Sequence, residues 1–311
     1  MTALVADSRC LQHETGLGHP EKPRRFTAVM DGLRKAGLTD RMLSVEPRIV
    51  TPEDLELAHD PRYLALAERE INAGLPQLST GDTTVCESSW EVAQVAAGSA
   101  LAGVDAVLSG RAANAFCVVR PPGHHASADQ GMGFCILNNT ALAARHAQRR
   151  YGIERVLIVD WDVHHGNGTQ DIFYADGSVF FFSTHQSPWY PGTGRVNETG
   201  QGAGLGATLN CPLPAGSGRE EILGAFEDQL VPAMEKFRPE FVLISAGFDS
   251  RLGDPLGHFQ LTDQDFADLT KIVRQIADHS AQGRVVSVLE GGYDLAGLAS
   301  AATAHVGALL A

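Results

Sequence analysis

Asp160, Asp162 and His164 stand at alternating positions in the chain. In an extended segment alternate side chains point to the same side, so these three are predicted to project together. Two carboxylates and an imidazole on one face repel or desolvate badly without a cation, and the same groups are good ligands for zinc or another divalent first-row metal. We expect Asp162, His164 and the later Asp249 to be three protein ligands, which leaves the open fourth position of a catalytic zinc site.

The adjacent residues His124 and His125 are candidates for proton transfer. A hydrolytic metal site needs a base for the attacking water and an acid for the leaving amine, and histidine suits both tasks near neutral pH. Two adjacent imidazoles need different orienting partners, and Asp160 and Asn167 can supply them. Tyr293, which follows two glycines, can donate its hydroxyl to a substrate carbonyl and to the oxyanion that forms from it.

Taken alone, an Asp-x-Asp segment or a histidine pair is more often a turn or capping feature than a site. The combination of these groups with predicted strand ends favours a site. Other histidines lie in helical or turn contexts and are expected to be core or surface residues, namely His59, His146, His279 and His305. His185 can line the site, but the sequence does not place it.

Short apolar runs alternate with longer helical patterns, which predicts βαβ units around a parallel sheet. The expected strands are residues 115–119, 155–160, 179–183, 241–245 and 284–289. The expected helices are residues 88–108, 139–151 and 219–237, one that starts after Thr262 and one that starts near Asp294. The glycine-rich stretch 188–218 and the stretch 121–133 interrupt this rhythm and are predicted to be long, functional loops.

Polar clusters follow four of the expected strands, at their carboxyl ends. That edge of an open α/β sheet is where ligands bind, so residues far apart in sequence are expected to converge there. No linker composition divides the chain, and residues 1–311 are predicted to form a single catalytic domain.

The composition excludes some classes of function. The formal charge is 24 − 37 = −13, which disfavours binding to nucleic acid, because that binding requires neutralisation of phosphates by Lys and Arg. Five scattered cysteines form no C-x-x-C pair, so neither a disulfide framework nor a cysteine zinc site is expected. There is no signal-peptide pattern, and no apolar run approaches the ~18 residues of a membrane helix. We therefore expect a cytoplasmic setting and no membrane partner.

These residues together resemble the histone deacetylase superfamily, which includes bacterial histone-deacetylase-like and acetylpolyamine amidohydrolases. The resemblance spans nearly the whole chain and is closer to the class II branch. It is carried by residues 18–21, 120–126, 133–135, 138–139, 159–170, 190–194, 247–249, 253–257 and 289–293. It implies an arginase-deacetylase-like α/β fold, with a central parallel sheet of about eight strands flanked by helices.

For the reaction, the resemblance implies zinc on Asp162, His164 and Asp249, in agreement with the spacing argument; iron(II) also suits this ligand set. It implies that His125 is the main general base and acid and that His124 is its electrostatic partner. Tyr293 would polarise the acetyl carbonyl. A structural potassium ion is implied as well, with Asp160 and Ser183 as side-chain ligands and backbone oxygens from Asp162, His164 and Thr184.

For the substrate, the resemblance implies a narrow tunnel with Phe134 and Tyr190 as aromatic walls and Gly133 at its side. The glycine before Tyr293, Gly292, permits a tight approach to a bound ligand. Asp82 is a candidate rim carboxylate that holds substrate backbone.

The chain departs from its relatives at informative positions. Asn167 stands where class I enzymes have aspartate, and Tyr293 stands where a nearly inactive class II subgroup has histidine. Leu256 stands where the polyamine-specific relative has a glutamate. The missing charge favours acyl-lysine over acetylpolyamine.

The sequence therefore predicts a zinc-dependent amidohydrolase that removes acetyl or other acyl groups from lysine side chains of proteins or peptides. The alternatives are an acetylpolyamine deacetylase, which acts on a small acetylated amine, and a non-catalytic acyl-lysine binder. Arginase-type ureohydrolysis is more distant, because Ser250 and Arg251 follow Asp249 and supply no carboxylate for a second metal. The sequence gives no indication of oligomeric state.

Overall fold

A computed structural model describes residues 1–311, and its centre is one sheet of eight strands in the order β2-β1-β3-β8-β7-β4-β5-β6. All neighbouring strands run parallel. The strands are β1 Thr2–Ala6, β2 Leu43–Val45, β3 Asn114–Val118, β4 Val156–Asp160, β5 Val179–Gln186, β6 Thr208–Leu213, β7 Phe241–Ala246 and β8 Val285–Leu289. This architecture confirms the predicted fold class.

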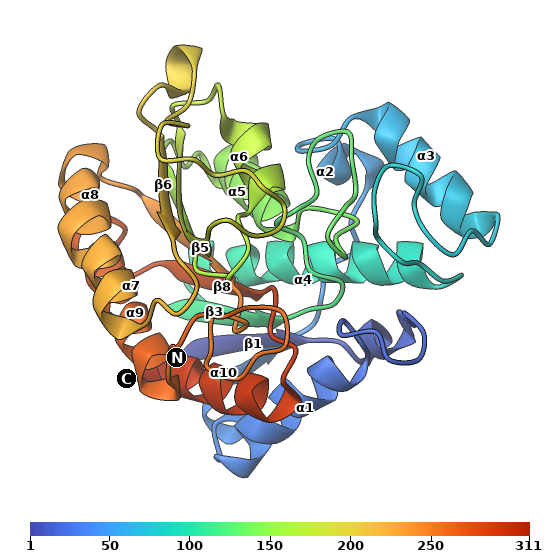
Figure 1. Cartoon of the computed structure of the whole chain (residues 1–311), viewed down its shortest axis with the longest axis horizontal. Coiled ribbons are helices and arrows are strands. Elements are labelled where there is room, and N and C mark those ends of the chain that lie inside the picture. The colour runs from blue at the N-terminus through green and yellow to red at the C-terminus, as the bar shows by residue number, and fades with distance from the viewer.

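Helices cover both faces of the sheet (Figure 1). Helices α4 and α5 pack together on one face, and α1, α9 and α10 pack together on the other. The helices are α1 Arg24–Lys35, α2 Pro52–Leu55, α3 Pro61–Asn72, α4 Ser89–Leu108, α5 Asn139–Tyr151, α6 Asn167–Phe173, α7 Arg219–Ala225, α8 Val231–Phe237, α9 Asp263–Ser280 and α10 Leu295–Leu310. Because both faces are covered, β3, β4, β5, β7 and β8 are buried throughout, which explains their continuous apolar sequences.

Helix α4 corrects one expectation from the sequence. It is long and apolar enough, by length and composition alone, to cross a membrane, yet 78% of the apolar window is buried inside the protein. Alanine and glycine dominate it, so no uninterrupted run of large apolar residues marks it in the sequence. Its small side chains permit close packing: a Cβ at Gly103 would lie 2.8 Å from Cys117 Sγ of β3. Helix α4 is a core helix of this fold.

Strands β1, β2 and β6 were absent from the sequence-based expectation. Strands β2 and β6 lie at the two edges of the sheet; β2 has three residues, and β6 lies inside the stretch 188–218 that was expected to be a loop. Strand β6 contains Pro212, which an edge strand tolerates because one side of the strand makes no ladder hydrogen bonds. The predicted helix 219–237 is continuous but contains a π-helical turn at Phe226–Leu230.

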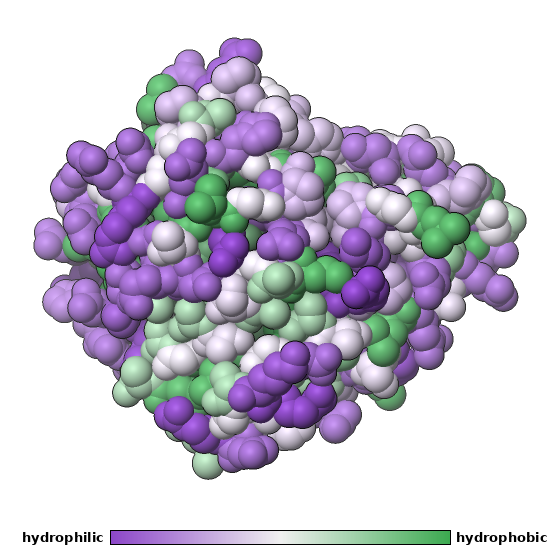
Figure 2. All heavy atoms as spheres, turned by 60° about the horizontal axis from the view of Figure 1, so that its bottom comes forward, coloured by the Kyte–Doolittle hydropathy of each residue, from purple (hydrophilic) through white to green (hydrophobic).

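The order β3-β8-β7-β4 makes neighbours of the four strands that precede the polar clusters. Since the strands are parallel, their carboxyl ends meet at one edge of the sheet, and the loops that follow converge there. On the face in Figure 2, hydrophobic residues form patches among hydrophilic ones.

Candidate metal and catalytic site

Asp162, His164 and Asp249 lie together at the convergent edge. One possible ligand atom from each lies within 4.8 Å of the others, and all three residues are buried. His164 Nδ1 is 3.0 Å from Asp162 Oδ1 and 3.2 Å from Asp249 Oδ2. Asp162 and His164 follow β4 and Asp249 follows the adjacent β7, so two neighbouring central strands position the cluster.

Backbone amides anchor one oxygen of each carboxylate. Gly291 N donates to Asp162 Oδ2 at 2.8 Å, and Val163 N donates to Asp249 Oδ1 at 3.0 Å. The other oxygen of Asp249, Oδ2, is buried and forms no hydrogen bond, although His164 Nδ1 lies 3.2 Å away. The surrounding backbone leaves no room for further side chains, because a Cβ at Gly291 would lie 2.0 Å from Asp249 Oδ2. These residues fit a divalent cation, which would supply the partner that this buried oxygen lacks.

The charges of the cluster support the same conclusion. Burial, together with the neighbouring Asp162, raises the pKa of Asp249 to about 7. The two carboxylates therefore resist being ionised side by side in the absence of a cation.

The two adjacent histidines have different partners and opposite electrostatic environments. His124 Nδ1 lies 2.9 Å from Asp160 Oδ2, and His125 Nδ1 lies 2.8 Å from Asn167 Oδ1. Although burial alone would lower it, the pKa of His124 is well above its ordinary value because Asp160 and Asp162 face the ring. Burial and the neighbouring His124 and His164 hold the pKa of His125 well below its ordinary value. His124 is therefore suited to be a cation and His125 to be a neutral base.

A pocket of about 210 Å³ opens onto this cluster. The Tyr190 ring stands perpendicular to that of His125 at a centroid distance of 5.2 Å, and the Phe134 ring lies 5.9 Å from that of Tyr293. The pocket is lined by Asp82, His125, Gly133, Phe134, His164, Trp189, Tyr190, Leu256 and Tyr293. Aromatic walls thus lead to one metal-ligand candidate, one histidine and one tyrosine hydroxyl.

The rim of the pocket is tied together by hydrogen bonds between loops. Asp82 Oδ1 accepts from Gly133 N at 2.7 Å and from the Tyr190 hydroxyl at 3.2 Å. Trp189 Nε1 donates to the Leu256 carbonyl at 2.8 Å. Trp189 was not singled out in the sequence, although its place beside Tyr190 in a long loop was an available signal.

The other predicted residues lie close to the site without lining the pocket. Asp160 and Ser183 are paired across β4 and β5 and are buried, with Thr184 next along β5. The Ser183 hydroxyl is 2.9 Å from His185 Nδ1. Gly292 lies behind Tyr293, and its carbonyl accepts from Arg25 Nε at 2.6 Å.

Buried charges behind Tyr293 were missed as functional residues. The Arg25 guanidinium lies 4.9 Å from the centre of the Tyr293 ring, and Glu21 pairs with both Arg25 and Arg120. Although burial opposes it, Arg120 lowers the pKa of Glu21 to about 2. Glu21 and Arg120 lie in motifs that resemble the family. They are 99 positions apart, and the sequence did not indicate that they form an ion pair.

Glu290 and Asp254 were missed as well. Glu290 Oε2 accepts from Gly123 N at 2.6 Å and from His124 N at 3.1 Å, and burial raises the pKa of Glu290 to about 7. Asp254 Oδ2 accepts from Tyr293 N at 2.6 Å. Both carboxylates hold backbone that carries predicted catalytic groups, a role that side-chain spacing does not reveal.

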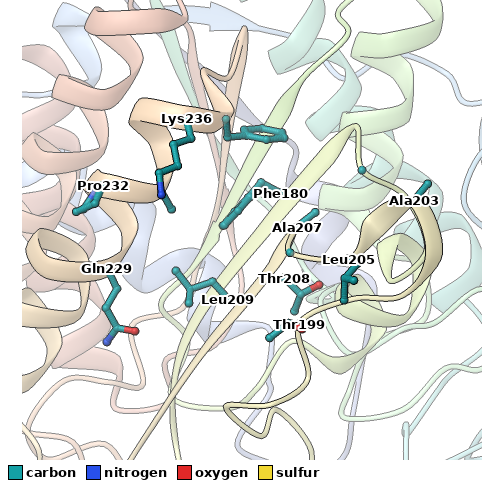
Figure 3. Close-up of a pocket in the computed structure, with 14 residues that line it drawn as sticks. Phe180, Thr199, Ala203, Leu205, Ala207, Thr208, Leu209, Gln229, Pro232 and Lys236 are labelled. Carbon is teal, nitrogen blue, oxygen red and sulfur yellow. The ribbon is translucent and has the colours of Figure 1, made fainter.

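A second and larger hollow, of about 660 Å³, lies beside β5 and β6 and is shown in Figure 3. It is lined by Phe180, Leu205, Leu209, Pro232 and Lys236 among others. Lys236 is its one titratable lining residue. None of the predicted site residues lines this hollow, whereas several of them line the smaller pocket. The smaller pocket is therefore the better candidate for an active site.

Comparisons with known proteins agree with the fold. The family model described as histone deacetylase domain matches residues 19–309. A probable deacetylase of Archaeoglobus fulgidus is 40% identical over 299 residues, covering 96% of this chain and 82% of the relative. The histone deacetylase-like amidohydrolase of Pseudomonas aeruginosa is 38% identical, covering 94% of this chain and 81% of the relative.

Two further comparisons bear on fold and substrate. Polyamine deacetylase HDAC10 of Mus musculus is 44% identical over 93% of this chain, which spans 45% of that longer protein. The crystal structure of the HDA15 HD domain superposes with a TM-score of 0.94 at 37% identity, covering 99% of this chain and 88% of that chain.

Proposed function

Since this chain belongs to the histone deacetylase family, we propose that it is a zinc-dependent hydrolase that removes acetyl groups from lysine side chains of proteins or peptides. The observation that carries this proposal is the juxtaposition of a buried Asp162–His164–Asp249 cluster with His125 and Tyr293 at the end of one aromatic pocket. A metal, a base and an oxyanion donor in one place are the requirements of amide hydrolysis by activated water.

In this proposal Asp162, His164 and Asp249 hold the zinc ion. When bound, zinc supplies Lewis acidity toward a carbonyl oxygen and lowers the pKa of water. His125 takes a proton from the attacking water at Nε2, because its Nδ1–H donates to Asn167 Oδ1. The same nitrogen then protonates the departing lysine amine.

The remaining side chains orient the substrate and stabilise developing charge. The Tyr293 hydroxyl donates to the acetyl oxygen and continues to donate as that oxygen becomes an oxyanion. His124, held by Asp160, places positive charge beside His125. Phe134 and Tyr190 pack against the aliphatic stem of the acylated lysine and exclude water from the reacting centre.

Further features of the proposal follow from the chemistry of the residues. Iron(II) is an alternative metal, because the same ligand set suits both ions. We also propose a potassium ion held by Asp160, Ser183 and nearby backbone oxygens, because Asp160 and Ser183 are buried and paired across β4 and β5. Residues 1–311 are proposed to act as one catalytic domain in the cytoplasm.

Hydrolysis of an acetylated polyamine is the second candidate. The mouse relative that is 44% identical is named a polyamine deacetylase, which favours this substrate. Leu256 favours lysine, because an uncharged side chain lines the pocket where the polyamine-specific relative has glutamate.

The deciding experiment measures acetate release by purified, zinc-loaded protein from an acetyl-lysine peptide and, in parallel, from an acetylated polyamine. A matched sample with a chelator measures the metal-independent background. We expect chelator-sensitive turnover that favours the peptide. Preference for the polyamine would transfer the proposal to the second candidate, and zinc binding without release from either substrate would indicate a non-catalytic acyl-lysine binder.

A further inference from the structure

Glu290 lies between Tyr293 and the loop that carries His124 and His125. It follows β8, three positions before Tyr293, and its side chain crosses to the loop that follows the adjacent strand β3 and carries His124 and His125. Glu290 is completely buried. A buried carboxylate is costly, so its partners define what it contributes.

The two carboxylate oxygens face different elements. Oε2 accepts from Gly123 N at 2.6 Å and from His124 N at 3.1 Å. Oε1 is 3.4 Å from the Thr140 hydroxyl of α5 and 3.3 Å from the Ser245 hydroxyl of β7. A single side chain therefore fixes the backbone of the histidine loop relative to two other elements.

Carbonyl groups of the histidine loop have other partners, because His124 O accepts from Thr169 N at 3.1 Å and Ala126 O accepts from Asn138 Nδ2 at 2.9 Å. The first amides of the loop, in contrast, donate to Glu290. The loop begins with two prolines, Pro121 and Pro122, which have no N–H groups to donate, so the amides of Gly123 and His124 are the first that can tie it down. At Gly123, a Cβ would lie 2.5 Å from Asn139 N, so the loop is pressed against the start of α5.

We infer that Glu290 is a positioning residue that sets the placement of the His124 and His125 imidazoles by accepting hydrogen bonds from the backbone of their loop. The inference rests on the proposed hydrolase function for its effect on turnover. It does not require the negative charge, because a neutral amide oxygen of the same reach also accepts from two N–H groups. The raised pKa of Glu290, about 7 as a result of burial, agrees with a neutral form that costs little.

Two conservative variants separate reach from charge. In Glu290→Gln, the amide oxygen can face Gly123 and His124, while the amide nitrogen donates to the Thr140 and Ser245 hydroxyls, which can rotate to accept. In Glu290→Asp, the charge remains, but the side chain is shorter by one methylene group and cannot reach both sides. We expect Glu290→Asp to lose on the order of 10²-fold in kcat, because a shift of ~1 Å in catalytic groups has such an effect, with little change in KM. Glu290→Gln is expected to retain most of the turnover.

A second measurement does not depend on activity. Hydrogen exchange of residues 120–126 is expected to be faster in Glu290→Asp and to stay close to wild type in Glu290→Gln, with unchanged zinc stoichiometry in both. The matched control is Asp265→Ala, which removes another buried carboxylate that accepts a backbone N–H, from Thr262 at 2.7 Å, far from the pocket. This control should lower stability without lowering kcat.

The outcomes distinguish the inference from the proposed function. Turnover in Glu290→Gln as low as in Glu290→Asp would overturn the inference in favour of a role for charge. Unchanged kcat and unchanged exchange in Glu290→Asp would overturn it as well. If wild-type protein released no acetate, the proposed function would fail, and the exchange data would still support or reject the positioning by Glu290.

Discussion

In the proposed mechanism, individual side chains either hold the metal ion or take part in proton transfer and hydrogen bonding to the substrate oxygen. Tyr293 belongs to the second group. It lines the pocket, its ring lies 4.9 Å from the Arg25 guanidinium, and its amide donates to Asp254 at 2.6 Å. These contacts hold the ring and the backbone of Tyr293 and do not involve its hydroxyl. The hydroxyl can therefore donate to substrate.

Removing that hydroxyl should therefore affect turnover more than folding. Tyr293→Phe is expected to lose ~10²–10³ in kcat, the usual loss for one oxyanion donor, with zinc content unchanged. Acetate release under substrate saturation measures the effect. The matched control is Tyr151→Phe, which removes a hydroxyl that donates to Asp105 at 2.9 Å, away from the pocket. Near-wild-type kcat in Tyr293→Phe would remove Tyr293 from the mechanism.

The proposed metal ligands illustrate what residue spacing can predict. Asp162 and His164 were identified because side chains alternate in an extended segment, and Asp249 because it follows a neighbouring strand. In the structure β4 ends at Asp160 and residues 162–164 form bends, yet all three predicted ligands lie within 4.8 Å of one another. The backbone around them was not foreseen. Gly247 and Gly291 are present because the carboxylate oxygens occupy the space of a Cβ, at 2.2 Å and 2.0 Å respectively, and this depends on three-dimensional proximity.

Gly291→Ala is thus expected to disturb the cluster directly. The new methyl group would displace Asp249 Oδ2 and Asp162 Oδ2, which lie 2.0 Å and 2.5 Å from the Cβ position. We expect loss of bound zinc, measured by metal analysis of purified protein after dialysis. Gly307→Ala is the control, because nothing lies within 4 Å of its Cβ position on α10. Full zinc occupancy in Gly291→Ala would contradict the proposed metal site.

At the scale of elements, the five central strands were predictable from the sequence, and the internal strand β1 and the two edge strands were not. The five strands expected from the sequence are the central ones, whose runs of Val, Ile and Phe reflect helices on both faces. Strand β1 is also internal, but its Thr-Ala-Leu-Val-Ala sequence has fewer large apolar residues. Edge strands need only one ladder of hydrogen bonds, so β6 can form from a segment with a proline and flanking glycines.

Helix α10 is joined to the elements around it by His305. Its Nε2 is 2.9 Å from the Ser287 hydroxyl of β8, and its Nδ1 is 2.6 Å from the Thr270 hydroxyl of α9. Burial lowers the pKa of His305 from 6.5 to about 3. Of the two expectations for His305, a core or a surface residue, its complete burial shows the first.

This burial predicts a pH dependence of stability. Between about pH 6.5 and about pH 3, the unfolded state binds a proton at residue 305 and the folded state does not, so the free energy of unfolding falls as pH falls. One such group contributes at most ~1.4 kcal/mol per pH unit. His305→Gln should flatten the curve by up to that slope, measured by denaturant unfolding from pH 7 to 4. The exposed His279→Gln serves as the control, and an unchanged slope in His305→Gln would contradict the assignment.

At the scale of the whole molecule, the site is built at the expense of stability. Two central strands deliver Asp162 and Asp249 into a buried position where their carboxylates face one another, and Asp249 Oδ2 has no hydrogen-bond partner. In the absence of a cation this arrangement costs free energy. The sequence could suggest the ligands but not this cost, because the cost depends on how completely the fold excludes water.

Asp249→Asn should separate the cost of the metal-free cluster from the stabilisation that zinc provides. The amide oxygen can still accept from Val163 N, and the amide nitrogen can donate to Asp162, so repulsion is replaced by a hydrogen bond. We expect the metal-free variant to unfold at a higher temperature than metal-free wild type. Zinc at 100 times its Kd should stabilise wild type by about 2.7 kcal/mol and the variant far less. Thermal unfolding with zinc and with chelator measures both quantities.

The control for this test is Asp105→Asn, which neutralises a carboxylate paired with His146 at 2.7 Å, away from the metal cluster. It should lose stability and keep the full response to zinc, because its carboxylate has favourable partners and is not a metal ligand. A lower unfolding temperature for metal-free Asp249→Asn would mean that the cluster is not repulsive. An undiminished zinc response would mean that the ion binds elsewhere. The opposite signs expected for the two variants follow from one difference: the carboxylate of Asp105 is hydrogen-bonded to His146 and Tyr151, whereas Asp249 Oδ2 forms no hydrogen bond and has only the His164 ring nitrogen nearby, at 3.2 Å.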